Sequence, residues 1–414
     1  MNDFRFEPVA LPPEAAALRT EVRAFLEKEI AEGNFKPTVG AMVAADPAFS
    51  AKCGERGYLG MTWPKQYGGH ERSALERYVV IEEMLAVGAP VMAHWIADRQ
   101  SGPQILRHSN ERVKRMILPE VAAGRCFFAI GMSEPDTGSD LAGVKSRASK
   151  TEGGYLVNGR KVWTSFAHGS HYLIGLFRTG GRPEERHIGL TQLIIDLKTP
   201  GITIRPIINV YGAHEFNEVT FDDVFVPADM TVGGEGQGWA MVISELAYER
   251  SGPDRFLSTF PLLVEAFREL GPDPHPAAAA EFGRLVAHLA TLRRMSTSIA
   301  GLLQKGESPA TQAALVKDLG TTFEQEIPEV VRRVLPIEAR FTRQDDLYAQ
   351  LQQISQQQAP SYSLRGGTRE ILRGMYFWTW QTDEILAMRC YGPDCVGFGF
   401  AFHEGQYTAV TALP

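Results

Sequence analysis

Residues 130–140 read I-G-M-S-E-P-D-T-G-S-D, and residues 155–165 read Y-L-V-N-G-R-K-V-W-T-S. The first segment is typical of a strand that ends in a turn, where Gly138 permits close backbone approach to a ligand. Taken by itself, this segment is better explained as a plain structural turn. The second segment places a large aromatic residue, Trp163, directly before two hydroxyl residues. A flat ring with hydrogen-bonding groups at its rim favours stacking of a heteroaromatic ligand.

The sequence on either side of these segments divides the chain into three parts. Apolar residues recur at helical spacing up to Arg125 and again from about residue 233 onward, whereas the middle is rich in β-branched and aromatic residues between Gly, Asn and Asp turns. This order predicts an α+β multidomain fold. We expect a helical N-terminal domain at 1–125, a central β-barrel or β-sandwich domain at 126–232, and a C-terminal four-helix-bundle domain at 233–414 with an atypical tail.

The middle part contains six predicted strands. They are residues 127–132, 155–157, 171–177, 190–196, 202–206 and 218–225.

Composition limits the classes of function. The 414 residues are 44% hydrophobic and carry a net charge of −7, which gives no global attraction for nucleic acid. No apolar run approaches the ~20 residues that span a bilayer, and no secretory signal is visible, so we expect a cytoplasmic protein without a membrane span. The four cysteines are scattered, and the neighbouring pairs Cys390/Cys395 and His168/His171 lack further ligands at usable spacing. We therefore predict no metal site, and we interpret the two histidines as loop or site-lining residues.

Six motifs occur in an order that resembles the acyl-CoA dehydrogenase family over nearly the whole chain. They are W-P-K-Q-Y-G-G at 63–69, S-E-P-D-T-G-S-D at 133–140, N-G-R-K-V-W-T-S at 158–165, F-D-D-V-F-V-P at 221–227, G-E-G-Q-G-W at 234–239 and G-G-T-R-E-I-L at 366–372. Each motif is weak alone, but six in order make chance similarity improbable.

The resemblance implies FAD as cofactor and an acyl-CoA thioester as substrate. In the implied reaction a carboxylate removes the α-proton, flavin N5 accepts hydride from the β-carbon, and electrons leave to an electron-transferring flavoprotein. The implied cofactor contacts are Met132 and Ser133 at the ring, Gly138 and Ser139 near the pyrophosphate, Trp163 as stacking aromatic, Thr164 and Ser165 at the ring edge, and Thr368 and Glu370 from the C-terminal domain. Ser139, Arg250 and Gly366 are the implied substrate contacts.

The catalytic base departs from the commonest family pattern. Many relatives place a glutamate directly before Gly-Thr, where this chain has Gly366-Gly367-Thr368. The resemblance offers a second solution, a glutamate on the helix after the β-domain, which here is Glu249. Helical spacing supports it, because Glu249 continues the apolar stripe of Trp239, Val242 and Leu246. Burial would raise the pKa of Glu249 toward that of a general base, while Arg250 would oppose the shift.

The alternative for Glu249 is a structural ion pair with Arg250 or another cation. Gly366 cannot act as a base, but its backbone N–H could polarise the thioester carbonyl.

A second departure concerns the adenine end of FAD. The chain resembles bacterial branches that act on bulky acyl groups such as steroid side chains, some of which assemble from two different subunits. Their usual arginine near residues 276–280 is missing here, so either another residue or a partner chain holds the phosphates. We expect a homo- or heterotetramer. Alternatives are a non-catalytic or half-site subunit of a heteromer, and an oxygen-reacting relative such as an acyl-CoA oxidase or flavin monooxygenase.

Overall fold

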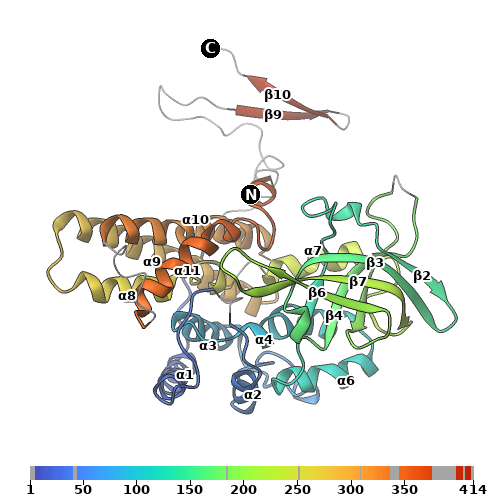
Figure 1. Cartoon of the computed structure of the whole chain (residues 1–414), viewed down its shortest axis with the longest axis horizontal. Helices are drawn as coiled ribbons and strands as arrows, with labels where there is room; N and C mark the ends of the chain where they lie inside the picture. Colours follow the sequence, from blue (N-terminus) through green and yellow to red (C-terminus); the bar gives the residue numbers. More distant parts are fainter. Residues whose placement is uncertain are drawn as a thin grey trace.

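The computed structural model describes residues 5–40, 44–182, 185–249, 252–307, 309–335, 345–374, 398–403 and 406–411 (Figure 1). Side chains are described for the same residues except 245–249, 398–403 and 406–411. No helix among these residues is long and apolar enough to cross a membrane.

The N-terminal part is helical, as predicted. Its elements are α1 (Pro13–Ala31), α2 (Pro47–Glu55), η1 (Lys65–Tyr67), α3 (Ala74–Ala86), α4 (Met92–Ile96), η2 (Ala97–Ser101), α5 (Gly102–His108) and α6 (Glu111–Ala122). Helix α3 begins with a capping box in which the Ser73 and Glu76 side chains each accept from the other's backbone N–H. The W-P-K-Q-Y-G-G motif serves packing, since Trp63 is buried against Gly69 and Gly102 at positions where a Cβ would clash with it.

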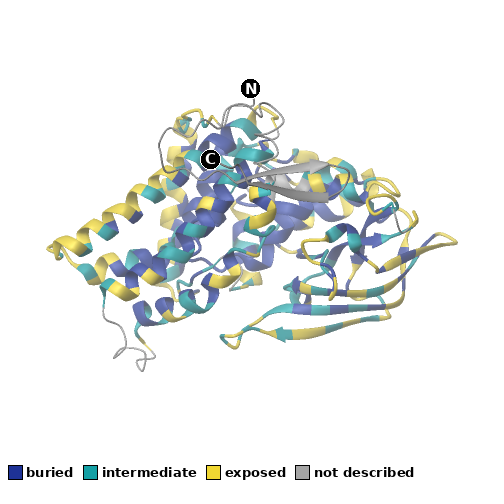
Figure 2. Cartoon of the chain, turned by 90° about the horizontal axis from the view of Figure 1, so that it is seen from above, coloured by how far each residue is buried: buried dark blue, intermediate teal, exposed yellow. Residues whose placement is uncertain are grey.

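The middle part forms one mixed sheet of eight strands. They are β1 (Phe128–Gly131), β2 (Arg147–Thr151), β3 (Gly154–Ser165), β4 (Tyr172–Arg178), β5 (Leu190–Asp196), β6 (Ile202–Ile208), β7 (His214–Pro227) and β8 (Thr231–Val232). The pairing order is β6-β7-β3-β2-β4-β5-β8, with β1 parallel to β4. Burial alternates along the edge strand β6 and its neighbour β7 (Figure 2).

The predicted strands depart from the observed ones most at β2 and β3, and the short strand β8 was also missed. Strand β2 was missed because only Ala148 of its five residues is buried. Strand β3 was predicted to end at Val157 but continues to Ser165, because it follows the long strand β7 through two register shifts. The second shift lies just before Thr164, so the chain is irregular where Trp163 stands.

The C-terminal part returns to helices: α7 (Gly238–Glu249), η5 (Pro253–Arg255), α8 (Phe260–Leu270), α9 (Pro276–Gln304), α10 (Ala310–Val334) and α11 (Leu347–Tyr362). The glutamine-rich tract lies in α11, where buried Gln352 donates to the Pro328 carbonyl of α10 at 2.8 Å. In the tail, β9 (Phe398–His403) pairs antiparallel with β10 (Gln406–Thr411). Cys390 and Cys395 lie outside the described residues.

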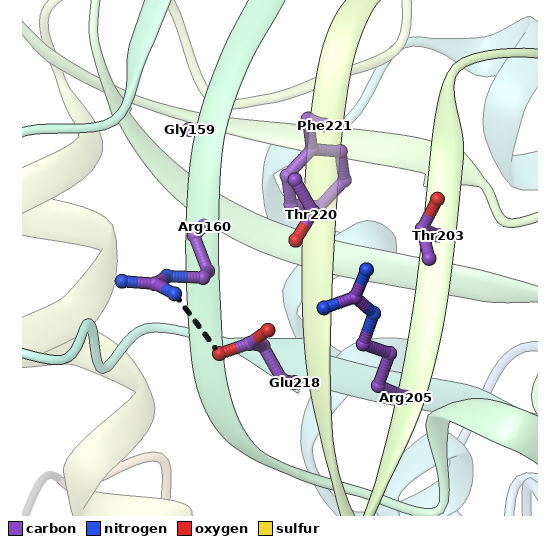
Figure 3. A pocket seen from close by; sticks show the side chains of 7 residues that line it. All are labelled: Gly159, Arg160, Thr203, Arg205, Glu218, Thr220 and Phe221. Atoms are coloured by element: carbon purple, nitrogen blue, oxygen red, sulfur yellow. Dashed lines mark ion pairs between the residues drawn. The ribbon is translucent and has the colours of Figure 1, made fainter.

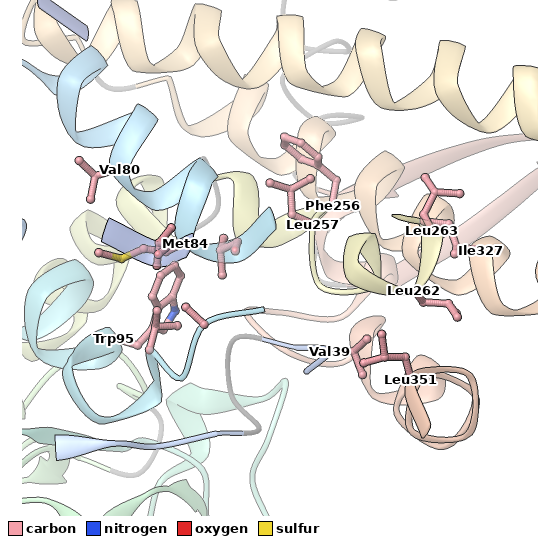
Figure 4. Packing of buried hydrophobic residues seen from close by; sticks show 14 of the residues in the cluster. Val39, Val80, Met84, Trp95, Phe256, Leu257, Leu262, Leu263, Ile327 and Leu351 are labelled. Atoms are coloured by element: carbon pink, nitrogen blue, oxygen red, sulfur yellow. The ribbon is translucent and has the colours of Figure 1, made fainter. Parts of the chain in front are cut away.

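Two large hydrophobic clusters hold these parts together. One joins the N-terminal helices to the segment after η5 and to the C-terminal helices, with Trp95 and Met84 on one side and Phe256 and Leu351 on the other (Figure 4). The other joins α4 to α6 with the sheet. The α+β class, with a sheet domain between helical parts, is therefore confirmed. The three domain boundaries stay a prediction.

Candidate cofactor and active site

The turn after β1 is anchored by a buried lysine on β3. The Lys161 ammonium donates to the carbonyls of Met132 at 3.2 Å and Leu176 at 2.6 Å, and to Oε1 of Glu134 at 2.9 Å. Burial lowers the pKa of Lys161 to about 8, although Glu134 opposes that shift. These bonds tie the start of the 133–140 turn to the strand that carries Trp163.

Glu134 also fixes the far side of the same turn. Its carboxylate accepts the backbone N–H groups of Lys145 at 2.7 Å and Ser146 at 3.0 Å. Burial acts to raise the pKa of Glu134, but Lys161 and these donors outweigh it and the pKa is lowered. The turn is thus held in one conformation by buried charge-assisted bonds.

The outer part of the turn presents groups that the chain itself does not use. Gly138 and Ser139 are exposed, and a Cβ at Gly138 would meet open space, so no described residue requires glycine there. The Thr137 hydroxyl is buried and has no hydrogen-bond partner among the described residues. Ser133, half-buried, accepts the Val162 N–H at its carbonyl at 3.0 Å.

Trp163 lies beside this turn with an uncommon backbone conformation and an exposed side chain. Its backbone has a φ of 58°, which is uncommon for a bulky residue, and its side chain is 59% exposed. The ring packs edge-on against Phe216 with centroids 5.9 Å apart. Next to it Thr164 is fully buried, and its hydroxyl has no described partner, while Ser165 is half-buried.

An exposed ring and two orphaned buried hydroxyls fit a bound heteroaromatic cofactor. A buried hydroxyl without a partner costs roughly 1–3 kcal/mol, so such groups call for a ligand or ordered water. The residues at the end of β3 and in the turn after β1 therefore fit the flavin that the sequence motifs imply.

Two histidines and an asparagine, which the sequence analysis did not connect, form a cluster that holds the Thr164 backbone. The His168 and His214 rings stack 3.8 Å apart, and both hydrogen-bond with buried Asn217, whose amide donates to the Thr164 carbonyl at 3.0 Å. Burial, followed by the charge of His214, lowers the pKa of His168. His171 lies apart from this cluster, with Nδ1 accepting the Phe127 N–H. No local pattern links residues 168 and 214.

Helix α7 packs its apolar stripe against the cofactor turn. Trp239 and Val242 belong to a small cluster with Met132 and Leu176. The Gln104 amide of α5 donates to the Met241 carbonyl at 3.3 Å, which attaches the helix to the N-terminal part. Glu249 is the last residue of α7. Its side chain and the whole of Arg250 lie outside the described residues, so their roles stay predictions.

Buried ion pairs fix the chain just beyond Glu249. Asp254 pairs with Arg99 of η2 at 2.9 Å, and both side chains are buried. The Arg365 guanidinium donates to the Asp254 carbonyl at 3.1 Å, to Ser258 Oγ at 2.9 Å and to the buried Glu324 carboxylate at 2.5 Å. The segment after α7 is therefore joined to the residue that precedes Gly366.

The Gly366-Gly367 turn adopts a left-handed backbone that glycine tolerates, with φ values of 68° and 95°. Lys317 of α10 donates to the Gly367 carbonyl at 2.6 Å. Thr368 accepts the Ile371 N–H at 3.4 Å, as a residue capping the helical turn that follows.

Thr368 and exposed Glu370 were both predicted cofactor contacts. Glu370's own backbone N–H, then the Thr368 hydroxyl, lower the pKa of its carboxyl. Among the described residues, no hydrogen bond or ion pair joins Thr368 or Glu370 to the turn or to Trp163, and their part in cofactor binding stays a prediction.

Comparison with known proteins gives consistent matches. The model of the acyl-CoA dehydrogenase N-terminal domain matches residues 12–125, and that of the middle domain matches residues 129–224, together just over half of the chain. Acyl-CoA dehydrogenase FadE29 of Mycobacterium tuberculosis is 35% identical over 61% of this chain and 65% of its own length. The chain spans about half the length of other curated relatives.

Solved structures extend the likeness to most of the chain. The structure named Tcur3481-Tcur3483 steroid ACAD is 26% identical with a TM-score of 0.78, covering 92% of this chain and 99% of that one. The ChsE4-ChsE5 complex of Mycobacterium tuberculosis is 26% identical with a TM-score of 0.76, covering 91% and 99%.

Proposed function

Because this chain belongs to the acyl-CoA dehydrogenase family, we propose that it catalyses the FAD-dependent α,β-dehydrogenation of an acyl-CoA thioester. The observation that carries the proposal is the pairing of the exposed Trp163 ring with the buried, unpartnered Thr164 hydroxyl. When bound, FAD would supply the two-electron acceptor for this oxidation. Met132, Ser133, Gly138, Ser139, Trp163, Thr164 and Ser165 would hold it, with Thr368 and Glu370 reaching it from the C-terminal part.

Glu249 is the proposed base that removes the α-proton. Support comes from α7, whose stripe of Trp239 and Val242 packs beside Met132 and so faces the cofactor turn. Glu249 lies ten residues after Trp239 on the same helix. The Asp254 ion pair with Arg99 follows five residues later and restrains the end of that helix. A base must be held within hydrogen-bond reach of its proton, which this restraint favours.

The substrate thioester is proposed to contact Ser139, Arg250 and the backbone of Gly366. The Gly366-Gly367 turn is held by Lys317 and by the Arg365 network, which also holds the segment after α7. A fixed backbone donor near a thioester carbonyl would stabilise the negative charge that develops there when the α-proton leaves.

The acyl group is proposed to be bulky, and the assembly to contain four subunits. The likeness to a structure named as a steroid ACAD supports the first point. The likeness to the ChsE4-ChsE5 complex favours a second candidate, a half-site subunit of a heteromeric dehydrogenase. Electron-transferring flavoprotein is the proposed acceptor of the electrons.

The test uses the purified full chain under anaerobic conditions with a panel of straight, branched and steroid-bearing acyl-CoAs. Wild type is expected to be yellow and to bleach with bulky acyl-CoAs. Glu249→Gln should keep its flavin but lose bleaching, while the control Glu152→Gln, an exposed residue of the turn between β2 and β3, should bleach normally. Unaltered bleaching in Glu249→Gln would show that Glu249 is not the base. A chain that gains flavin only with a co-expressed partner would favour the heteromer.

A further inference from the structure

The end of β3 carries two residues with an uncommon backbone on either side of Thr164. Trp163 has a φ of 58° and Phe166 a φ of 54°, in the left-handed region that residues other than glycine rarely adopt. Such a backbone persists only where the surrounding structure over-determines it. The register of β3 with β7 shifts between Lys161 and Thr164, so Trp163 itself has no register partner on β7. The restraint must therefore come from side chains as well as from the sheet.

Asn217 of β7 supplies such a restraint. Its side chain is fully buried, and its amide nitrogen donates to the Thr164 carbonyl at 3.0 Å. A carbonyl cannot donate, so the amide nitrogen must face Thr164, which leaves Oδ1 of Asn217 for its contact with Nε2 of His214 at 2.7 Å. His214 must then donate from Nε2, because an amide oxygen only accepts.

His168, on the short helix η4 (Ala167–Gly169), completes the network. Its Nδ1 lies 3.2 Å from the amide nitrogen of Asn217 and 3.3 Å from Oδ1. Because Oδ1 already accepts from His214, a neutral His168 uses Nδ1 to accept the second amide hydrogen. With a proton on Nδ1 it would instead compete with His214 for Oδ1. The two imidazole rings stack with centroids 3.8 Å apart, so charge on one ring disfavours charge on the other.

We propose that Asn217, oriented by the His168–His214 pair, is a positioning residue for the dehydrogenation. It holds the backbone of residues 163–165 in the conformation that presents the Trp163 ring and the Thr164 hydroxyl to the flavin, and it does so while His168 is neutral. This inference rests on the proposed flavin cofactor. Burial, followed by the charge of His214, lowers the pKa of His168 below its ordinary value of about 6.5, so the neutral form prevails at pH 7.

The sheet directs its other titratable groups away from the histidines. Helix η4 packs against β1, which has no titratable residue, against β6, which has Arg205, and against β7. Besides His214, the titratable residues of β7 are Glu215, Glu218, Asp222 and Asp223. Glu218 and Arg205 line an open pocket, in which Glu218 pairs with Arg160 (Figure 3). Glu215 hydrogen-bonds Tyr211, and the two aspartates lie toward the far end of β7.

The experiment titrates the deflavinated full chain with FAD between pH 5 and 8, followed by flavin fluorescence. Binding is measured without substrate, so titration of the proposed base in the reaction does not enter. In wild type the Kd for FAD should rise roughly three- to tenfold as the pH falls from 7.5 to 5, an effect of about one hydrogen bond. His168→Gln keeps an uncharged hydrogen-bonding side chain at this position and should flatten that rise.

Asn217→Asp tests the amide donor itself. A carboxylate cannot donate to the Thr164 carbonyl, and its charge favours protonated histidines, so the Kd for FAD at pH 7.5 should rise about tenfold. The pH dependence should also move to higher pH, which a damaged fold does not cause. Asn158→Asp makes the same change in an exposed asparagine of β3 and is the matched control, expected to bind FAD as wild type does.

Three results would overturn the proposal. They are a constant Kd of wild type across this pH range, the same rise in His168→Gln as in wild type, and wild-type affinity in Asn217→Asp. Failure of wild type to bind flavin at any pH would instead contradict the proposed function.

Discussion

The cofactor face and the proposed base region are built in different ways. The cofactor face uses two neighbouring segments of one domain, joined by the buried Lys161–Glu134 pair. The base region is assembled from four distant segments, through Arg99, Asp254, Glu324 and Arg365. Residue types alone therefore indicate the first site, whereas the second depends on long-range ion pairs that only the fold brings together.

The largest effect is expected when the anchor of the cofactor face is removed. Lys161→Met leaves the Glu134 carboxylate buried without its cation, which should lower the free energy of unfolding by about 3–5 kcal/mol and empty the flavin site. Urea unfolding and flavin content measure both changes. The control Lys145→Met breaks an exposed pair with Asp136 on the same turn and should cost less than about 1 kcal/mol. Equal stability of the two variants would contradict this anchoring role.

Breaking the base region should separate activity from cofactor binding. Arg365→Met removes the donor shared by Asp254, Ser258 and Glu324, at a cost of about 1.5–3 kcal/mol in unfolding free energy. Reduction by acyl-CoA should slow while flavin content stays near wild type, as followed by anaerobic stopped-flow absorbance. Arg332→Met, an exposed pair on the same helix as Glu324, serves as control. Loss of flavin in Arg365→Met would show that the two regions are not independent.

A smaller change tests the orphaned hydroxyl of the cofactor face. Thr164→Val removes a buried hydroxyl that has no partner among the described residues. The free energy of unfolding of the flavin-free protein, measured in urea, should therefore stay the same or rise by up to about 1 kcal/mol. Flavin affinity should instead fall roughly three- to tenfold, measured by fluorescence titration. Unchanged affinity would mean that this hydroxyl does not meet the cofactor.

The smallest effect concerns a contact between the sheet and helix α11. Glu215 of β7 hydrogen-bonds Tyr211, whose hydroxyl accepts from Gln358 of α11 at 3.0 Å. Burial raises the pKa of Glu215. Because the folded protein favours the neutral acid, its stabilising contribution is complete below the ordinary glutamate pKa of about 4.3 and is lost as pH rises through the folded value.

Glu215→Gln should remove that slope, since glutamine stays neutral. The free energy of unfolding, measured in urea between pH 4 and 8, should then differ from that of wild type with a slope of at most about 1.4 kcal/mol per pH unit. Parallel curves for the two proteins would contradict the shifted pKa.

Much of the fold is readable from the sequence because helical spacing is sustained over long segments such as α9 and α10. Strand β2 could not be predicted from the sequence, because only one of its five side chains, Ala148, is buried. The extension of β3 is also hidden, because Lys161 looks like a surface lysine until Glu134 is placed opposite it.

The candidate site divides in the same way. Trp163 and Thr164 could be predicted from side-chain chemistry within one strand. The partnership of Arg99 with Asp254 spans 155 residues, and that of Arg365 with Asp254 spans 111, so no local pattern could link them.

The most direct test measures flavin stoichiometry and anaerobic bleaching by a bulky acyl-CoA in the same preparations of Trp163→Ala and Glu249→Gln. We predict that Trp163→Ala loses flavin, and that Glu249→Gln keeps flavin but reduces it at least about a hundredfold more slowly than wild type. Full flavin content in Trp163→Ala, or wild-type bleaching in Glu249→Gln, would contradict a site in which one region holds the cofactor and the other supplies the base.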